Sequence, residues 1–299
     1  MDLVNHLEGR LLFAVPKKGR LQQATLDLLS GADVQFRRET RLDIALVKNL
    51  PIALIFLPAA DIPTFVGEGR VDIGITGRDQ VAEHDATLPA GEVSGVEEIL
   101  DLGFGGCKLQ VQVPQKGDIN EASQLVGRNV VTSFTALSEA FFAKLEGVAP
   151  GEKLSTKIKY VGGSVEAACA LGVADGIVDL VESGETMKAA GLKAIDTVVE
   201  STAVLVKSRN SNTDLLNLIT SRIRAIRPVP VQHSSLQTGN RIKNYPGKRA
   251  PTITALEEPE WVAVSSMVEK KRIATVMDEL IKVGATDILV LNIANSRTD

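Results

Sequence analysis

The residues best suited to chemistry follow an apolar run at positions 173–181, which carries Asp175 and Asp179. Such a run predicts a buried strand with acidic side chains. A tight polar turn comes next, and a helix is expected to begin at Met187. The turn consists of Glu182, Ser183, Gly184, Glu185 and Thr186. A glycine-containing loop between a strand and a helix offers free backbone N–H groups at the positive helix end, which can hold a phosphate.

The side chains in and beside this turn suggest which phosphate compound it would hold. Ser183 and Thr186 would add hydroxyl donors, and Gly184 would let the backbone approach an anion closely. The carboxylates of Asp179 and Glu182 could accept hydrogen bonds from ribose hydroxyls or face Mg²⁺ held by a diphosphate. The pattern therefore indicates a phosphorylated sugar. On these residues alone, an ordinary loop of an α/β protein is an equal alternative.

An earlier stretch repeats this arrangement. Gly69-x-x-Asp72 leads into an apolar run, as Gly172-x-x-Asp175 does before the strand described above. The repeat predicts two similar α/β lobes that face each other. Ligands of open α/β sheets bind beyond the carboxyl ends of the strands. In the first lobe, that strand end consists of Thr76 and Gly77.

Two further loops could bind anions. Lys17 and Arg20 follow a buried-strand run at 11–15 and could meet a triphosphate, Arg20 through two parallel hydrogen bonds. A solvated basic loop is an equal alternative for them. A second hydroxyl-rich segment precedes a helix that extends to about residue 145, where capping of that helix is the favoured role. This segment contains Thr132, Ser133 and Thr135.

Composition limits the classes of function. The chain has 299 residues, enough for two or three domains, and its cores must be aliphatic because aromatic residues make up only 4%. A net charge of −4 argues against a binder of nucleic acid or of an anionic membrane. The two cysteines fit a reducing cytosol, and the N-terminus is not a signal peptide. The three histidines lie far apart and lack metal-ligand spacing.

The stretch 166–187 resembles the signature of the ATP phosphoribosyltransferase family. Met187 stands where the family usually has Leu, and the segment 18–21 resembles the family's K-G-R-L motif. The resemblance extends over residues 11–292. The signature positions matched are Glu166, Gly172, Ala174, Asp175, Val178, Asp179, Ser183, Gly184 and Thr186.

The resemblance implies a two-lobed α/β catalytic part similar to the type II periplasmic-binding-protein fold. A C-terminal ferredoxin-like (ACT-like) α+β regulatory domain would follow. The expected divisions are catalytic lobe I at 1–107, with 195–211 returning to it, and lobe II with the PRPP loop at 108–194. A linker helix and a histidine-binding regulatory domain would occupy 212–299. The family assembles as homo-oligomers, from dimers to hexamers, and we expect the same in the cytoplasm.

The implied reaction transfers phosphoribosyl from phosphoribosyl diphosphate (PRPP) to N1 of ATP with Mg²⁺, releasing diphosphate. It is the first step of histidine biosynthesis, inhibited by histidine in the family. A non-catalytic small-molecule-binding module on the same fold is the alternative. No metal ligands are assigned. The predicted catalytic residues are Asp179 and Glu166, and the predicted PRPP-binding residues are Asp179, Glu182, Ser183, Gly184, Glu185 and Thr186. The predicted ATP-binding residues are Lys17, Arg20, Asp72, Thr76 and Gly77.

The C-terminal part also resembles the family's regulatory domain, at 246–252 and 284–290. Thr252 and Asp287 would lie near the effector histidine. The segment 228–245 shows neither helical periodicity nor a convincing strand, so the regulatory module is expected to be incomplete. Either a gene-model error or a real loss of the module's first half would explain this.

Overall fold

The computed structural model describes residues 7–39, 42–89, 91–149 and 151–226, followed by 236–237, 252–255, 261–266, 268, 272–286 and 288–290. The chain divides into two compact units. The larger comprises Met1–Ser30 and Val34–Arg224, and the smaller comprises Gly31–Asp33 and Ala225–Asp299. Within the described ranges, no helix is long and apolar enough to cross a lipid bilayer.

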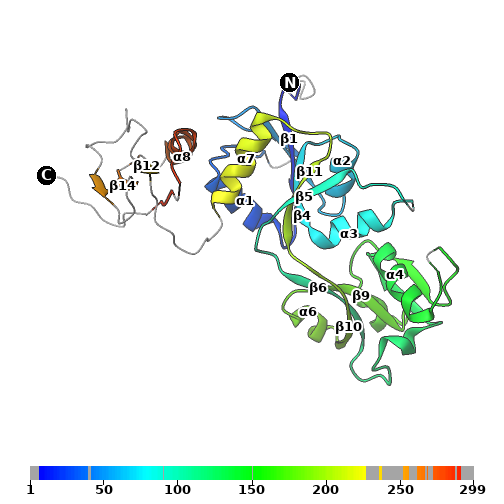
Figure 1. The fold of residues 1–299 in the computed structure, drawn as a ribbon. Coiled ribbons are helices and arrows are strands. Elements are labelled where there is room, and N and C mark those ends of the chain that lie inside the picture. Colours follow the sequence, from blue (N-terminus) through cyan, green and yellow to red (C-terminus); the bar gives the residue numbers. More distant parts are fainter. Residues whose placement is uncertain are drawn as a thin grey trace. The chain divides into compact units, whose positions relative to one another are not determined.

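The first lobe of the larger unit is built on a six-stranded mixed sheet with the order β2-β3-β1-β4-β11-β5 (Figure 1). Its strands are β1 (Leu11–Pro16), β2 (Ile44–Leu46), β3 (Ile52–Leu57), β4 (Ile73–Gly77), β5 (Val96–Asp101) and β11 (Ala203–Ser208). Helices lie on both sides of the sheet in Figure 1, so its central strands are apolar throughout. These helices are α1 (Gln22–Gly31), α2 (Ile62–Gly67), α3 (Arg78–Ala86) and α7 (Asp214–Ala225).

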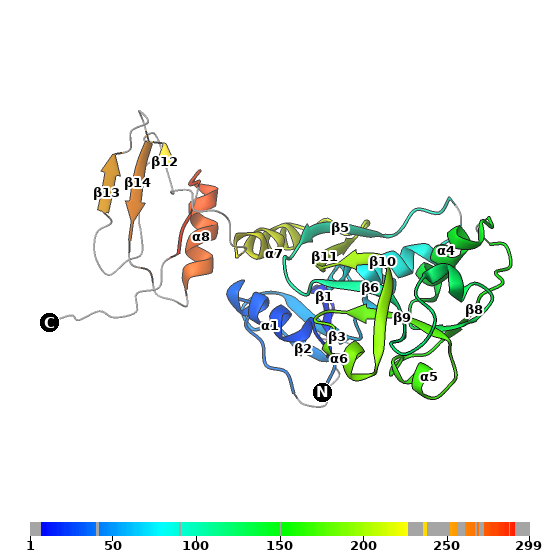
Figure 2. The same ribbon diagram turned by 90° about the horizontal axis from the view of Figure 1, so that it is seen from below.

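The second lobe is built on a five-stranded sheet with the order β10-β6-β9-β7-β8 (Figure 2). Its strands are β6 (Cys107–Pro114), β7 (Asn129–Thr132), β8 (Lys157–Tyr160), β9 (Gly176–Val181) and β10 (Leu192–Ser201). Its helices are α4 (Thr135–Glu146), α5 (Ala167–Ala170) and α6 (Glu185–Ala189), with a 3-10 helix at Ala122–Leu125. The buried aliphatic side chains of β6, β7 and β9 pack against Phe134 and Phe142.

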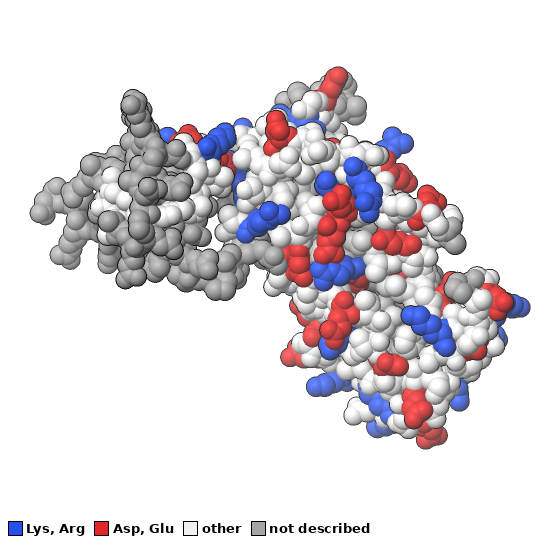
Figure 3. Space-filling model, viewed as in Figure 1, with Lys and Arg blue, Asp and Glu red and all other residues white. Residues whose placement is uncertain are grey.

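The chain passes between the lobes twice. It leaves the first lobe between β5 and β6 and returns between β10 and β11, so the whole second lobe is inserted into the first. The two-lobed α/β architecture is confirmed. A double crossing was expected, but with the return to the first lobe from residue 195, whereas β10 pairs with β6 in the second lobe as far as Ser201. On the face shown in Figure 3, acidic and basic side chains are interspersed over the described residues, without an extended basic surface.

The two lobes share one topology. In the first, β1 runs parallel to β3 and β4, and β11 runs antiparallel to β4 and β5. In the second, β7 runs parallel to β8 and β9, and β6 runs antiparallel to β9 and β10. The order β3-β1-β4-β11-β5 therefore corresponds to β8-β7-β9-β6-β10, with β2 as an additional edge strand of the first lobe.

The repeated Gly-x-x-Asp segments have the same geometry. Gly69 and Gly172 both adopt left-handed conformations, with φ of 70° and 69°, at the end of a helix. The aspartate that follows binds the neighbouring parallel strand in each lobe. Asp72 accepts the Leu12 amide at 2.7 Å, and Asp175 accepts the Asn129 amide at 3.0 Å. Each aspartate thus fixes the start of a parallel strand pair, a structural role at the strand end away from the carboxyl-terminal loops.

The described residues of the smaller unit form a three-stranded sheet with the order β12-β14-β13 and the helix α8. Its elements are β12 (Leu236–Gln237), β13 (Thr252–Ala255), β14 (Trp261–Ser265) and α8 (Ile273–Lys282). The pairing of β12 with β14 corrects the expectation that 228–245 has no strand. The remainder of that segment, and with it the expected incompleteness of the module, lies outside the described residues. Residues 288–290 are not in a strand.

Replacing Asp72 with Ala should lower the free energy of unfolding of the larger unit by about 2 kcal/mol. The Leu12 amide and the Ser211 hydroxyl, which donates to Asp72 at 2.9 Å, would both lose a charged acceptor. Urea denaturation measures the change, with the exposed Asp27→Ala as control. ATP affinity should not change, and a loss of ATP affinity at unchanged stability would return Asp72 to the binding site.

Candidate functional site

The loop between β9 and α6 is the predicted phosphate cradle. It has the expected order of strand, glycine turn and helix, although the helix begins at Glu185 rather than at Met187. Gly184 caps α6 in a left-handed conformation with φ of 78°, which a residue with a Cβ adopts only at a cost. Ser183 Oγ accepts the Glu185 amide at 3.4 Å. Glycine is therefore needed here to turn the backbone from the strand into the helix.

The loop presents its hydroxyls to solvent. Glu182, Ser183, Glu185 and Thr186 are all exposed. Within the described part of the chain, no side chain covers the hydroxyl of Thr186 or forms a hydrogen bond with it. The turn is thus not filled by the protein's own groups, and an incoming anion would meet two hydroxyls and the amides of the first turn of α6.

Asp179 lies on β9, two residues before the strand ends at this loop, and its carboxyl interacts electrostatically with Glu166. Asp179 occupies β9, and its Oδ1 accepts the Leu180 amide at 2.8 Å. Burial raises the pKa of the Asp179 carboxyl to about 6, the Leu180 N–H lowers it, and the negative charge of Glu166 raises it further. Glu166 reaches this position because it caps the short helix α5. Two carboxylates from separate segments thus interact near the end of the strand that leads into the loop.

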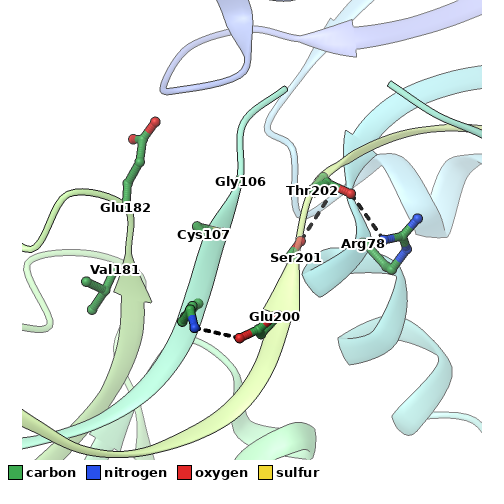
Figure 4. A pocket seen from close by; sticks show the side chains of 9 residues that line it. Arg78, Gly106, Cys107, Val181, Glu182, Glu200, Ser201 and Thr202 are labelled. Carbon is green, nitrogen blue, oxygen red and sulfur yellow. Dashed lines mark hydrogen bonds and ion pairs between the residues drawn. The ribbon is translucent and has the colours of Figure 1, made fainter. Parts of the chain in front are cut away.

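A pocket of about 440 Å³ lies between the ends of β6, β9 and β10. Figure 4 shows Glu182 at the end of β9 on one side and Ser201, Thr202 and Arg78 on the other. Cys107 lies between them, and burial raises the pKa of its thiol to about 11, so it is a neutral wall residue rather than a nucleophile. The pocket is therefore lined both by Glu182, the first residue after β9, and by the segments that connect the two lobes.

Arg20 lies at these connections. Its guanidinium donates to Asp79 Oδ1 at 3.0 Å and to the carbonyl of Gly105 on the segment that enters the second lobe. Asp79 is fully buried and also accepts the hydroxyl of Ser201 at the end of β10, on the returning segment. A Cβ on Gly77 would come within 2.1 Å of Asp79 Oδ1, so Gly77 leaves room for this carboxylate.

Three of the five predicted ATP residues use their polar side-chain groups for contacts within the first lobe. The Thr76 side chain is fully buried, and its hydroxyl donates to the Ala59 carbonyl at 2.7 Å. Asp72 fixes the far end of β4, so neither side chain faces the pocket. Lys17 pairs with Asp43 at 2.7 Å, a contact that lowers the pKa of the Asp43 carboxyl. Arg20 and Gly77 are the two that the structure brings together.

Arg78 is a pocket residue that the sequence analysis missed. Its guanidinium donates to Glu98 at 2.6 and 3.0 Å, to Asp101 at 3.1 Å and to the Thr202 hydroxyl at 3.1 Å. The Glu98 carboxylate is the main cause that raises the pKa of Arg78. Its position could have identified Arg78 from the sequence, because it directly follows the glycine that ends β4. The predicted phosphate loop occupies the equivalent junction between a strand and a helix in the second lobe.

The remaining predicted residues are those expected near the effector, since no metal ligands were assigned from the sequence. Thr252 begins β13, which pairs with β14, and Asp287 lies outside the described residues. No three His, Cys, Asp or Glu side chains gather into a metal-binding group within the described residues. A cation carried by the diphosphate of a substrate needs only one or two protein carboxylates. Asp179 lies on β9 and Glu182 directly follows that strand.

Comparison with known proteins identifies relatives over nearly the whole chain. Residues 58–226 match the family model described as "HisG: ATP phosphoribosyltransferase", and residues 229–295 match "HisG, C-terminal domain". The ATP phosphoribosyltransferase of Schizosaccharomyces pombe is 58% identical over 311 residues, covering 99% of this chain and 100% of that protein. That of Yarrowia lipolytica is 57% identical over 304 residues, with the same coverage.

A solved structure supports the fold. The "ATP phosphoribosyl transferase (HisG:HisZ) complex from Thermotoga maritima" contains a chain with a TM-score of 0.59 and 22% identity. The alignment covers 72% of this chain and 96% of that one.

Asp179→Asn should raise the free energy of unfolding above pH 6 by about 1–3 kcal/mol. The folded carboxyl has a pKa raised to about 6, so its contribution to stability is lost as pH rises from about 4 through 6. The amide removes that loss, and the gain should fade towards pH 4. Urea denaturation at pH 5 and pH 8 tests this; an equal gain at both values would show that the carboxyl is not titrating there.

Proposed function

Because this chain belongs to the ATP phosphoribosyltransferase family, we propose that its second lobe holds PRPP at the loop between β9 and α6, facing ATP on the first lobe. The protein is a pentosyltransferase of histidine biosynthesis. It transfers the phosphoribosyl group of PRPP to N1 of ATP and releases diphosphate. The observation that carries the proposal is the exposed, unfilled turn that directly follows β9, the strand that bears Asp179.

The transfer reaction mainly requires the protein to hold ATP and PRPP in the correct relative orientation. N1 of adenine carries a free electron pair, so it can attack C1 of the ribose without first losing a proton. The bond from C1 to the diphosphate oxygen breaks, and positive charge develops on the ribose ring at the transition state. Holding both substrates in line supplies much of the acceleration in such a displacement. Carboxylates close to the ring stabilise its developing charge.

On the PRPP side, the amides and hydroxyls of Ser183, Gly184 and Thr186 would hold the 5′-phosphate. The backbone N–H of Glu185 would contribute, whereas its carboxylate would point to solvent. Asp179 and Glu182 would accept hydrogen bonds from the ribose diol, with Glu166 beside them. At neutral pH the Asp179 carboxyl, whose pKa is about 6, is mostly ionised and can therefore accept two such bonds.

On the ATP side, Arg20 and Gly77 would lie against the nucleotide at the connections between lobes. Arg20 keeps a partly exposed guanidinium while it is bound to Asp79. Lys17, which is also partly exposed, would attract the triphosphate from the end of β1. Arg78 would approach the substrates from the pocket wall. Asp72 and Thr76 have no place in this arrangement, because their polar groups are used within the first lobe.

Mg²⁺ fits this arrangement as a partner of the diphosphate, with Asp179 or Glu182 as the protein carboxylate. When bound, it would neutralise charge on the leaving group. We further propose that histidine binds the smaller unit near Thr252 and Asp287, and that the protein is a homo-oligomer of the cytoplasm. The matched C-terminal family model and the two unpaired cysteines support these proposals.

A non-catalytic binding module on the same fold is disfavoured, since relatives more than half identical over their whole length are named as the transferase. Mixing the protein with ATP, PRPP and Mg²⁺ should release diphosphate and form N1-phosphoribosyl-ATP, which absorption and mass spectrometry detect. Release of diphosphate without the nucleotide product would indicate hydrolysis of PRPP instead.

Thr186→Val should weaken PRPP binding by about 1–3 kcal/mol, the loss expected when a hydrogen bond to a charged group is removed. Valine keeps the shape of the side chain, so the loop should stay folded. Isothermal titration with PRPP measures the change, and Thr87→Val, on an exposed threonine of the first lobe, is the matched control. Unchanged PRPP affinity in Thr186→Val would remove this loop from the site.

A further inference from the structure

The amino-terminal end of α4 is capped from the other lobe. Phe134, at the N-cap position, makes no side-chain hydrogen bond to the helix. The carboxylate of Glu83 on α3 takes that role, with one oxygen accepting the Ala136 amide at 2.8 Å and the other the Leu137 amide at 2.9 Å. The Thr135 hydroxyl also lies 3.4 Å from Glu83. A group of the first lobe therefore satisfies the free amides of a helix in the second.

This contact fills the hydroxyl-rich segment that could have held an anion. The Thr132 hydroxyl is fully buried, donates to the Val178 carbonyl at 2.7 Å and accepts the Phe134 amide at 2.9 Å. The helix amides that an anion would use are bound to Glu83. Capping was the favoured interpretation of this segment, but the cap is supplied from a different lobe rather than by its own hydroxyls.

The contact joins a helix of each lobe directly, so it restricts the angle between the two lobes. Arg20, Asp79 and Arg78 also join the lobes, through contacts with the two connecting segments. The Glu83 bonds lie where α3 packs against α4, one helical turn along α3 from Asp79. The two lobes are already joined by two connecting segments, and the Glu83 contact is a third attachment that fixes their relative orientation.

The bonds are also strong and directional. A carboxylate at a helix amino terminus is favoured both by the free N–H groups and by the helix dipole. Each oxygen of Glu83 binds a different amide, so rotation of one lobe against the other would break both bonds. We propose that Glu83 is a positioning residue of the transferase, which sets the lobe orientation at which ATP and PRPP meet. This inference rests on the proposed placement of the two substrates on opposite lobes.

Glu83→Ala should lower kcat by roughly tenfold, because a small misplacement of the reacting atoms is costly in a reaction that depends on alignment. PRPP affinity, measured by titration without ATP, should stay within about twofold, since the PRPP loop lies wholly on the second lobe. Glu139→Ala removes an exposed carboxylate from α4 itself and serves as the matched control, with kcat unchanged. Glu83→Asp should recover part of the lost rate, because it keeps the charge.

A rescue variant separates positioning from simple stabilisation of α4. Thr135→Asp in the Glu83→Ala background places a carboxylate in the first turn of the helix from its own lobe. This double variant should regain thermal stability while its kcat stays low. Recovery of kcat together with stability would overturn the proposal, as would an unchanged kcat in Glu83→Ala. If Glu83→Ala alone does not fold, the double variant decides the question by itself.

Failure of this inference is distinct from failure of the proposed substrate sites. The Glu83 variants are judged by kcat at retained PRPP affinity, whereas Thr186→Val is judged by PRPP affinity itself. Hydrogen exchange at the Ala136 and Leu137 amides adds a direct readout. Both should exchange at least tenfold faster in Glu83→Ala than in the control. Equal exchange rates at both amides in Glu83→Ala and in the control would show that Glu83 does not protect them in solution and would also overturn the proposal.

Discussion

The buried carboxylate of Asp79 is the interaction on which the two-lobed arrangement depends. A fully buried charge is tolerated only when it is paired and hydrogen-bonded. Arg20 supplies the opposite charge, and Ser201 and Gln80 supply hydrogen bonds. These partners come from the loop after β1, from α3 itself and from the end of β10, so the charge can be satisfied only when the connections between the lobes are in place. A requirement for electrostatic compensation thus determines where the pocket forms.

Much of the fold could be predicted because its central strands are buried on both faces and read as continuous apolar runs. The run at 173–181 and the repeated Gly-x-x-Asp segments led to the correct lobes. The strands β5 and β10 were missed for identifiable reasons. β5 carries three acidic residues in six, and β10 contains two register shifts against β6 that break the alternation of buried and exposed side chains.

Some features of the candidate site could likewise be predicted from the sequence, and others could not. The turn between β9 and α6 could be predicted because its polar groups are adjacent in sequence and directly follow a buried strand. The contact of the Thr76 hydroxyl with the Ala59 carbonyl could not be predicted, because residue type and strand position do not reveal which way a side chain points. Arg78 and Glu83 were not predicted, because their partners lie far away in the chain. Their roles arise from tertiary contacts that no local pattern encodes.

The shared topology of the lobes has a consequence for how substrate choice could change. β4 and β9 are equivalent strands, and each carries its chemistry just beyond its carboxyl end, basic after β4 and rich in hydroxyls and acids after β9. Such an arrangement is what duplication of a half-sized ancestor would leave behind. Because the aspartates that organise each half sit at the opposite strand ends, one loop can diverge while the other lobe keeps its ligand. The architecture therefore lets the donor and the acceptor of a transfer reaction evolve separately.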